Sequence, residues 1–273
     1  MMSAVSAIIL RDLRIARRYP LSVINLVLLT PLYQMAIPTL LLGTAFLVQG
    51  NAVGLGQFVG TTDLAGWLGL GVLVASLIVG VMWTVAGDLM SDRMTGVLEH
   101  SWATPARRES FVLGAAGTSF IFTLAASGLL ILFGVLVLDA RYAPSGLLLA
   151  APVLGVTLVG IIGFGHLAAA GILSLRKSSA LLDTAGYLLS ALSGVSFPLA
   201  VLPTPLREIT YLLPTAWGLD VMRHLTLGTE TMLPLPQACV ALVVTSVGVF
   251  TLGRMLFLRA ERALRTAGTL AQF

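Results

Sequence analysis

The residues best suited to bind another macromolecule lie in one short charged segment, 88–108. Within it, Asp92, Arg93 and Glu99 stand around Gly96. Glycine can break a helix or turn it sharply, so this pattern predicts a short helix–turn–helix that carries both signs of charge.

The same segment also carries the apolar side chains Val97, Leu98 and Trp102. A loop that is merely solvated has no need of a leucine and a tryptophan, because such side chains gain free energy only when another surface covers them. We therefore predict a protein-docking element here, and a solvated loop is the alternative.

Two ionisable residues stand within apolar stretches, Asp183 and His166. Such groups are costly inside a membrane and usually face protein or water. Asp183 has two readings: an ion pair with Lys177 or with an arginine near the N-terminus, or attraction of a cationic, amphipathic substrate. His166 is interpreted as a hydrogen-bonded contact between helices, with a proton or metal role as the alternative.

Catalytic and nucleotide-binding patterns are missing from the sequence. It contains no G-x-x-x-x-G-K-[ST], H-E-x-x-H or G-x-S-x-G, and Cys239 is its single cysteine. A disulfide within the chain or a cysteine-based metal cluster needs more than one thiol. We therefore predict that the chain is not an enzyme by itself, and we assign it no catalytic residue and no metal site.

The composition decides which elements must position these residues. The chain is 57% hydrophobic and only 10% charged, whereas soluble proteins are roughly a quarter charged. One membrane crossing takes about 20 residues, so the chain has room for about six. Each must be a helix, because hydrocarbon offers the backbone no hydrogen-bond partner. The prediction is a single all-α membrane domain over 1–273 with six spans: Leu21–Val48, Leu64–Leu89, Phe111–Leu138, Leu147–Leu175, Ala180–Leu202 and Leu235–Leu258.

Basic residues predict how these spans are oriented. Every lysine and arginine except Arg141, Arg207 and Arg223 falls on one side of the predicted bundle. Positively charged loops stay in the cytoplasm, so we predict a multi-pass protein of a bacterial plasma (inner) membrane with both termini cytoplasmic. The net charge of +4 is explained by this asymmetry, and no nucleic-acid partner is predicted.

The two ends of the chain are predicted to lie outside the six-span bundle, which covers 21–258. Residues 1–18 form an amphipathic pattern, with apolar side chains on one face and arginines on another. Such a helix lies along the membrane interface with its cations near anionic lipid headgroups. Residues 259–273 are predicted to be a cytoplasmic tail.

An outer segment, 194–228, is too rich in proline for one continuous helix. Thr215 is suited to cap a short helix in which Asp220 can pair with Arg223 or His224. The predicted short helices before the last span are too short to cross and too apolar for water. They should therefore dip back into the outer leaflet as a re-entrant cap, compatible with a gate.

Three predicted spans present polar or aromatic side chains on one face. Span five has the clearest stripe, at spacings of three and four residues. The members are Thr30, Gln34 and Thr44 in span one, Ser76, Gly80, Trp83 and Gly87 in span two, and Arg176, Ser179, Asp183, Tyr187, Ser190 and Gly194 in span five.

The order of these features resembles the type-two ABC export permease family, whose fold is shared with the G-subfamily of eukaryotic exporters. The resemblance covers essentially the whole chain. Val97 stands where threonine is commoner in the family. The matching residues are Asp92, Arg93, Gly96, Val97, Leu98, Glu99, Pro105 and Arg108 after span two, and Gly194, Phe197, Pro198, Leu202, Pro203, Leu213, Pro214, Asp220, Arg223 and Gly228 in the outer segment.

The resemblance implies a permease that exports a lipophilic or amphipathic compound by alternating access. It also implies a second permease half, either an identical copy or a paralogue, and two cytoplasmic ATPase subunits that use ATP and Mg, while this chain binds no cofactor. The implied roles are coupling to the ATPase for Asp92, Arg93, Gly96, Val97, Leu98 and Glu99, the substrate pathway for Gln34, Trp83, Asp183, Tyr187 and Ser190, and the outer gate for Phe197, Pro198, Pro214, Asp220 and Arg223.

Two other functions remain as alternatives. A proton-coupled secondary transporter would use several ionisable groups inside the membrane, and only Asp183 and His166 are candidates. A structural membrane subunit that transports nothing is the second alternative. A neighbouring gene for a soluble ATPase would favour the exporter over both.

Overall fold

The computed structural model describes residues 4–46, 53–94, 109–174 and 179–267, and every regular element in these ranges is a helix. The all-α class predicted from composition is confirmed for this part of the chain. The elements are α1 (Ala4–Arg18), α2 (Pro20–Ile24), the π-helical turn Asn25–Leu29, α3 (Thr30–Phe46), α4 (Val53–Val59), α5 (Leu64–Met94), α7 (Glu109–Val137), α8 (Pro144–Ser174), α9 (Ser179–Leu192), the 3₁₀ turn Leu199–Val201, α10 (Thr204–Thr210), α11 (Pro214–Leu227) and α12 (Leu235–Ala267).

Four of these helices, α5, α7, α8 and α12, are long and apolar enough to cross a membrane. They correspond to the second, third, fourth and sixth predicted spans. The end of α7 and the start of α8 lie within three residues of the predicted positions, and α5 and α12 both begin at the predicted residue. A multi-pass membrane protein is therefore the architecture that the described residues support.

The predicted first span is a continuous helical run with one widened turn. Backbone angles at Ile24, Asn25 and Thr30 are all right-handed helical, so α2, the π-helical turn and α3 follow one another from residue 20 to residue 46. The wide turn precedes Pro31, which has no N–H to complete the preceding turn and whose ring crowds it. The distortion near this proline takes the form of a π-helical turn.

The predicted fifth span is wrong at its C-terminal end. Instead of continuing to Leu202, α9 ends at Leu192 and the chain turns at Gly194. Gly194 has a φ of 74°, and the amides of Gly194 and Val195 bond to the carbonyls of Ala191 and Ser190. This is the Schellman arrangement, in which a glycine in the left-handed region closes a helix.

Two helices extend beyond their predicted inner ends. α5 continues through Met94, so residues 88–94 of the predicted coupling segment are part of that helix. α12 continues to Ala267, so the predicted tail, 259–273, is helical over its described part. The extension of α12, 259–267, is rich in arginine and alanine, which favour helix, and the shorter extension of α5 contains an arginine and two methionines, which also favour it. Hydropathy does not detect a helix that continues past the apolar region. The short helix α4 was not predicted either.

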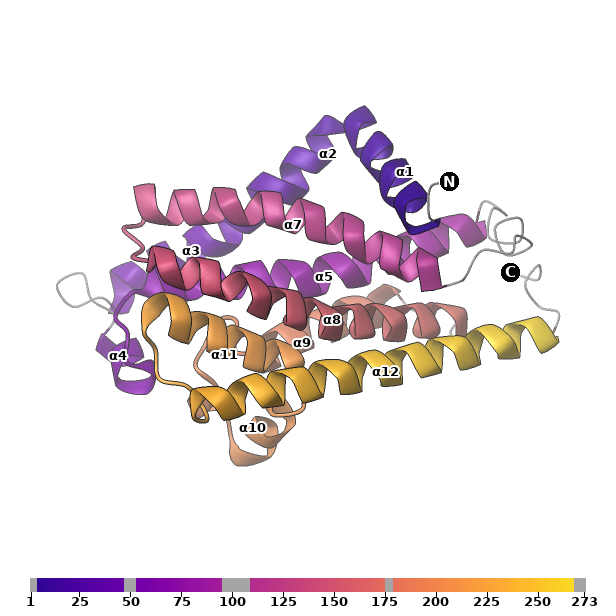
Figure 1. Ribbon diagram of the computed structural model, residues 1–273. Coiled ribbons are helices and arrows are strands. Elements are labelled where there is room, and N and C mark those ends of the chain that lie inside the picture. Colours follow the sequence, from indigo (N-terminus) through magenta and orange to yellow (C-terminus); the bar gives the residue numbers. More distant parts are fainter. Residues whose placement is uncertain (1–3, 47–52, 95–108, 175–178, 268–273) are drawn as a thin grey trace.

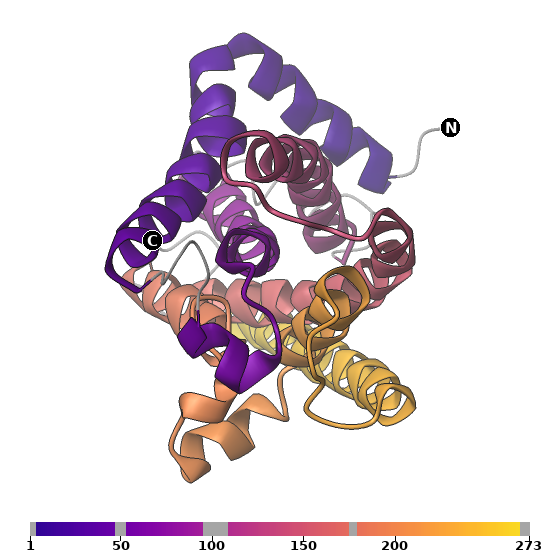
Figure 2. The ribbon, with the colours of Figure 1, turned by 90° about the vertical axis from the view of Figure 1, so that its left-hand side faces the viewer.

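The long helices lie side by side, and α5 is the most enclosed of them (Figure 1). Viewed along the bundle, α3, α7 and α8 surround α5 (Figure 2). Both α1 and α12 have their chain-terminal ends at the end of the bundle where α5 ends and α7 begins. The described parts of both chain termini therefore share one end of the molecule.

Helices α8 and α12 cross so closely that only glycine fits at the point of contact. A Cβ atom added at Gly253 of α12 would overlap the carbonyl oxygen of Gly163 on α8. A Cβ added at Gly160, one turn before Gly163, would meet the ring of Pro214. These glycines let α11 and α12 pack directly on the backbone of α8, as small residues do in helix pairs within membranes.

The outer segment forms the two short helices α10 and α11, but the predicted pairing within α11 is wrong. Asp220 accepts a hydrogen bond from the amide of Met232 at 3.1 Å, and His224 Nδ1 lies 2.6 Å from the carbonyl oxygen of Thr229. Arg223 points instead into the bundle. α11 also begins at Pro214, with Leu213 rather than Thr215 at the N-cap.

Candidate functional site

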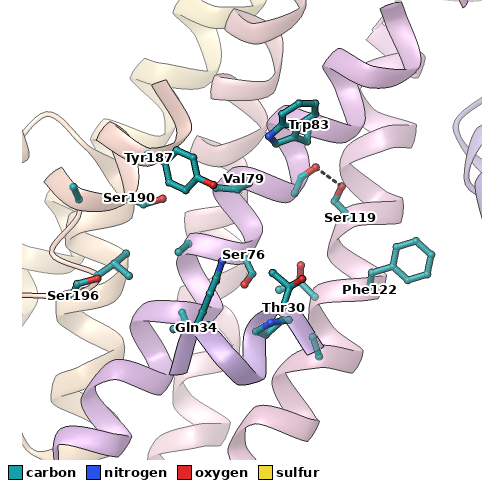
Figure 3. Close-up of a pocket in the computed structure, with 18 of the residues that line it drawn as sticks. Thr30, Gln34, Ser76, Val79, Trp83, Ser119, Phe122, Tyr187, Ser190 and Ser196 are labelled. Atoms are coloured by element: carbon teal, nitrogen blue, oxygen red, sulfur yellow. Dashed lines mark hydrogen bonds between the residues drawn. The ribbon is translucent and has the colours of Figure 1, made fainter. Parts of the chain in front are cut away.

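A cavity of about 370 Å³ lies among α3, α5, α7 and α9 (Figure 3). Its outer wall is the segment that follows α9, residues 195–197. Between the lining residues Val72 and Thr84, α5 rises by about 18 Å, since a helix advances about 1.5 Å per residue. This size and position are those of a pocket for a small molecule.

Four of the five residues predicted for the substrate pathway line this cavity. Gln34 comes from α3, Trp83 from α5, and Tyr187 and Ser190 from α9 (Figure 3). The polar or aromatic faces predicted for spans one, two and five, which are far apart in the sequence, thus meet at one cavity. Their role in transport remains a prediction.

The fifth predicted residue, Asp183, is not among the lining residues. It lies one turn before Tyr187 on α9 and is partly exposed. One reading of Asp183 was an ion pair with an arginine of the N-terminal helix. In that helix, Arg11 forms the described ion pairs, and its described partners are Asp12 and Asp88. Lys177, the other partner considered, lies outside the described residues.

Helix α7 supplies a wall of the cavity that was not predicted. Ser119, Phe122, Thr123 and Ala126 line it. Ser119 Oγ lies 3.1 Å from the carbonyl oxygen of Gly80 and 2.9 Å from Thr84 Oγ1. The signal that could have revealed this wall is the four-residue spacing of the hydroxyl residues Ser119, Thr123 and Ser127, of which the first two line the cavity.

The described side chains that line the cavity are apolar, aromatic, hydroxyl or amide groups, and none of them is acidic or basic. The hydroxyl of Ser190 already donates to the carbonyl of Gly186 at 2.8 Å. Trp83 and Tyr187 are 44% and 66% exposed, so the cavity opens where these two rings lie. Such a lining suits a compound with a large apolar surface and a few polar atoms.

Only some of the predicted gate residues lie at the wall 195–197. Phe197 lines the cavity, and Pro198 precedes the 3₁₀ turn. Pro214 is buried against α8, Asp220 faces the turn that leads to α12, and Arg223 is only 6% exposed. Phe197 and Pro198 belong to the segment 194–198, and Arg223 binds the carbonyls of this segment. Asp220 does not bind it and contacts Met232 instead.

The predicted coupling residues are only partly described. Asp92 and Arg93 lie in the last turn of α5. The others, Gly96, Val97, Leu98 and Glu99, lie outside the described residues. Residues 88–94 of the predicted helix–turn–helix continue α5, and the remainder of that prediction, 95–108, lies outside the described residues.

A network of charged groups connects α1 to the C-terminal part of α5. Arg11 Nη2 lies 2.6 Å from Asp88 Oδ2, and Arg11 Nε lies 2.9 Å from Asp12 Oδ1. The hydroxyl of Thr118 on α7 donates to Asp12 at 2.9 Å. Besides this network, α1 packs its isoleucines on two glycines of α7, Ile8 over Gly114 and Ile9 over Gly117. The N-terminal helix thus contacts both helices that flank the predicted coupling segment.

We expect charge reversal in this network to weaken the link between α1 and α5. Arg11→Glu faces two carboxylates, and because the pair is partly exposed we expect a loss of about 1 kcal/mol in stability. Adding Asp88→Arg restores an opposite-charge pair and should recover most of this stability. The measurement is thermal unfolding of each variant purified in detergent. Equal unfolding midpoints for Arg11→Glu and the unchanged protein would contradict a role for this pair.

Comparison with known proteins adds one finding. Residues 5–227 match the sequence model of the ABC-2 type transporter family. The matched range contains α1, every helix that lines the cavity, and α11. No curated protein matches the chain significantly.

Proposed function

Because the chain belongs to the ABC-2 type transporter family, we propose that it is the permease subunit of an ATP-driven exporter. Its cargo is a lipophilic or amphipathic compound that it moves out of the cell. The observation that carries the proposal is the cavity among α3, α5, α7 and α9, which lies within the family-matched region and joins four of the residues expected to contact cargo.

The proposed topology has six crossings with both termini in the cytoplasm. In addition to α5, α7, α8 and α12, the helical run over residues 20–46 is about 40 Å long, which is enough to span a bilayer. The described part of α9 is about 21 Å long. The turn at 193–198 would complete this crossing, and non-helical backbone is tolerated at membrane depth where protein buries it, as it buries Ser193, Gly194 and Val195 here.

Alternating access supplies the proposed mechanism. Two ATPase subunits would bind ATP and Mg, close together, and push on the segment that follows α5 in each of two permease halves. α5 lines the cavity over several turns and continues without a break to Met94. A push at its inner end would therefore reach the cavity through a rigid helix, and α10 and α11 would serve as the outer cap.

The charged residues of the coupling segment are expected to transmit this push. The double variant Arg93→Ala and Glu99→Ala should reduce coupled transport by about tenfold or more, since charge-assisted hydrogen bonds at a buried contact are each worth about 1.5–3 kcal/mol. ATP hydrolysis by the partner should continue. The measurement is the ratio of transported compound to ATP hydrolysed. An unchanged ratio would remove these two residues from the coupling step.

The function itself is tested by reconstitution. The chain is purified with the ATPase encoded nearest to it, placed in lipid vesicles, and assayed for hydrolysis that lipophilic compounds stimulate. Stable co-purification and ATP-dependent transport support the proposal. Transport by the isolated chain, driven by an ion gradient alone, would refute it and favour a secondary transporter.

A further inference from the structure

The most enclosed cation among the described side chains is Arg223 on α11, which is 6% exposed. Its described hydrogen bonds run to backbone carbonyls. Nη1 donates to the carbonyl of Gly194 at 2.8 Å, and Nη2 donates to that of Val195 at 3.0 Å. On the other edge of the guanidinium, Nη2 and Nε lie 2.9 and 3.3 Å from the carbonyl oxygen of Trp67.

The aromatic ring of Trp67 completes this site. The guanidinium carbon of Arg223 lies 3.4 Å from the centroid of the indole, close enough for a strong cation–π contact. Trp67 belongs to the first turns of α5, so one side chain of α11 is held by α5 through both a carbonyl and a ring. Only arginine has a planar group that can stack and donate in several directions at once.

The two carbonyls on the other side belong to the end of α9. Gly194 and Val195 close that helix in the Schellman turn, and the carbonyls at a helix C-terminus carry partial negative charge. Arg223 therefore neutralises the end of α9 and fixes it against α5. Gly71 of α5 permits this approach, because a Cβ atom there would overlap the carbonyl oxygen of Val195.

The same turn is the outer wall of the cavity. Val195, Ser196 and Phe197 line it, so the residue whose carbonyl Arg223 binds also contacts the space for cargo. We infer that Arg223 is a positioning residue that holds the wall 195–197 and thereby sets the affinity of the cavity for the transported compound. It acts through the wall and does not itself line the cavity. The claim that the wall sets the affinity for a compound rests on the proposed function. The claim that Arg223 holds the wall 195–197 in place does not.

The structural part is tested by thiol labelling in native membranes. Val195 is 6% exposed, so Val195→Cys, in a chain with Cys239→Ala, should react slowly with N-ethylmaleimide. Adding Arg223→Lys should raise the labelling rate by about tenfold, the factor expected when charge-assisted hydrogen bonds that hold a segment closed are lost. Arg207→Lys on the neighbouring helix α10 is the matched control and should leave the rate unchanged.

The functional part is tested with Nile red as the probe. Hydrolysis by the reconstituted complex is measured against Nile red concentration, and Arg223→Lys should raise KM several-fold while kcat changes little. A fall in kcat at constant KM would mean that Arg223 supports the fold and does not set the cavity wall. A complex that Nile red never stimulates would count against the proposed cargo class, whereas the labelling result would still decide the positioning role.

A second variant covers the case in which Arg223→Lys does not accumulate. Trp67→Leu keeps the backbone carbonyl and removes only the ring under the guanidinium, so the labelling rate at Val195→Cys should rise by a smaller factor. An unchanged labelling rate in every folded variant of Arg223 and Trp67 would overturn the inference.

Discussion

Gly80→Phe is expected to reduce transport by about tenfold or more while leaving the amount of folded protein unchanged, because a phenyl ring would take the space of the cargo. Gly80 lines the cavity, and the nearest atom to an added Cβ there is Cβ of Ser119 at 3.9 Å. A larger side chain can therefore enter without displacing α7. The measurement is efflux of a lipophilic dye from cells, normalised to the amount of protein in the membrane.

The matched control for this substitution is Gly87→Phe, two turns further along α5. Gly87 is exposed, and no atom lies within 4 Å of an added Cβ. It does not line the cavity, so efflux should remain near that of the unchanged protein. Equal efflux for Gly80→Phe and Gly87→Phe would show that the cavity is not on the path of the compound.

Gly253→Val is expected to destabilise the protein by at least about 3 kcal/mol, because overpacking against backbone forces two helices apart. The added Cβ would overlap the carbonyl of Gly163, and neither backbone can move away without separating α8 from α12. The core around Ile161, Phe164 and Phe257 would lose contacts along this crossing. Thermal unfolding of the purified chain in detergent measures the loss, and little folded protein should accumulate in cells.

Gly248→Val on the same helix controls for the change of residue type. Gly248 is exposed, with no atom within 4 Å of an added Cβ. Substitution at such a surface position changes stability by no more than about 0.5 kcal/mol. A midpoint of unfolding as high for Gly253→Val as for Gly248→Val would contradict the close packing of α8 and α12.

Hydropathy predicted both ends of α7 and α8 to within three residues, but for α5, α9 and α12 it predicted the beginning and missed the end. Leu64 and Leu235 were placed correctly, since each follows a polar or proline-containing stretch. The end of α9 was missed by ten residues, because the chain remains apolar beyond the turn. The signal was present, however: Gly194 followed by Pro198 is the sequence pattern of a helix C-terminus. A hydropathy window averages over such a pattern and cannot resolve it.

The walls of the cavity that carry distinctive polar or aromatic residues were predicted from the sequence, and the wall without them was missed. Polar or aromatic side chains on one helical face identified α3, α5 and α9. The contribution of α7 was overlooked because its serines and threonines stand among many small residues. The contacts of Arg223 were beyond sequence reasoning, since its described partners are backbone carbonyls, which every residue possesses. Opposite charge suggested Asp220 as its direct partner, but Asp220 accepts a hydrogen bond from Met232 and Arg223 donates to carbonyls.

The docking of α1 on α7 has a consequence for biosynthesis. Ile8 and Ile9 leave the ribosome before Gly114 and Gly117, the glycines that receive them, have been translated. The amphipathic N-terminal helix therefore cannot reach its docking site until the segment that forms α7 has been synthesised. Arg11 meets Asp88 in the same period, as the second segment emerges. The beginning of the polypeptide thus reaches its final place only after the later segments that it contacts, α5 and α7, have been made.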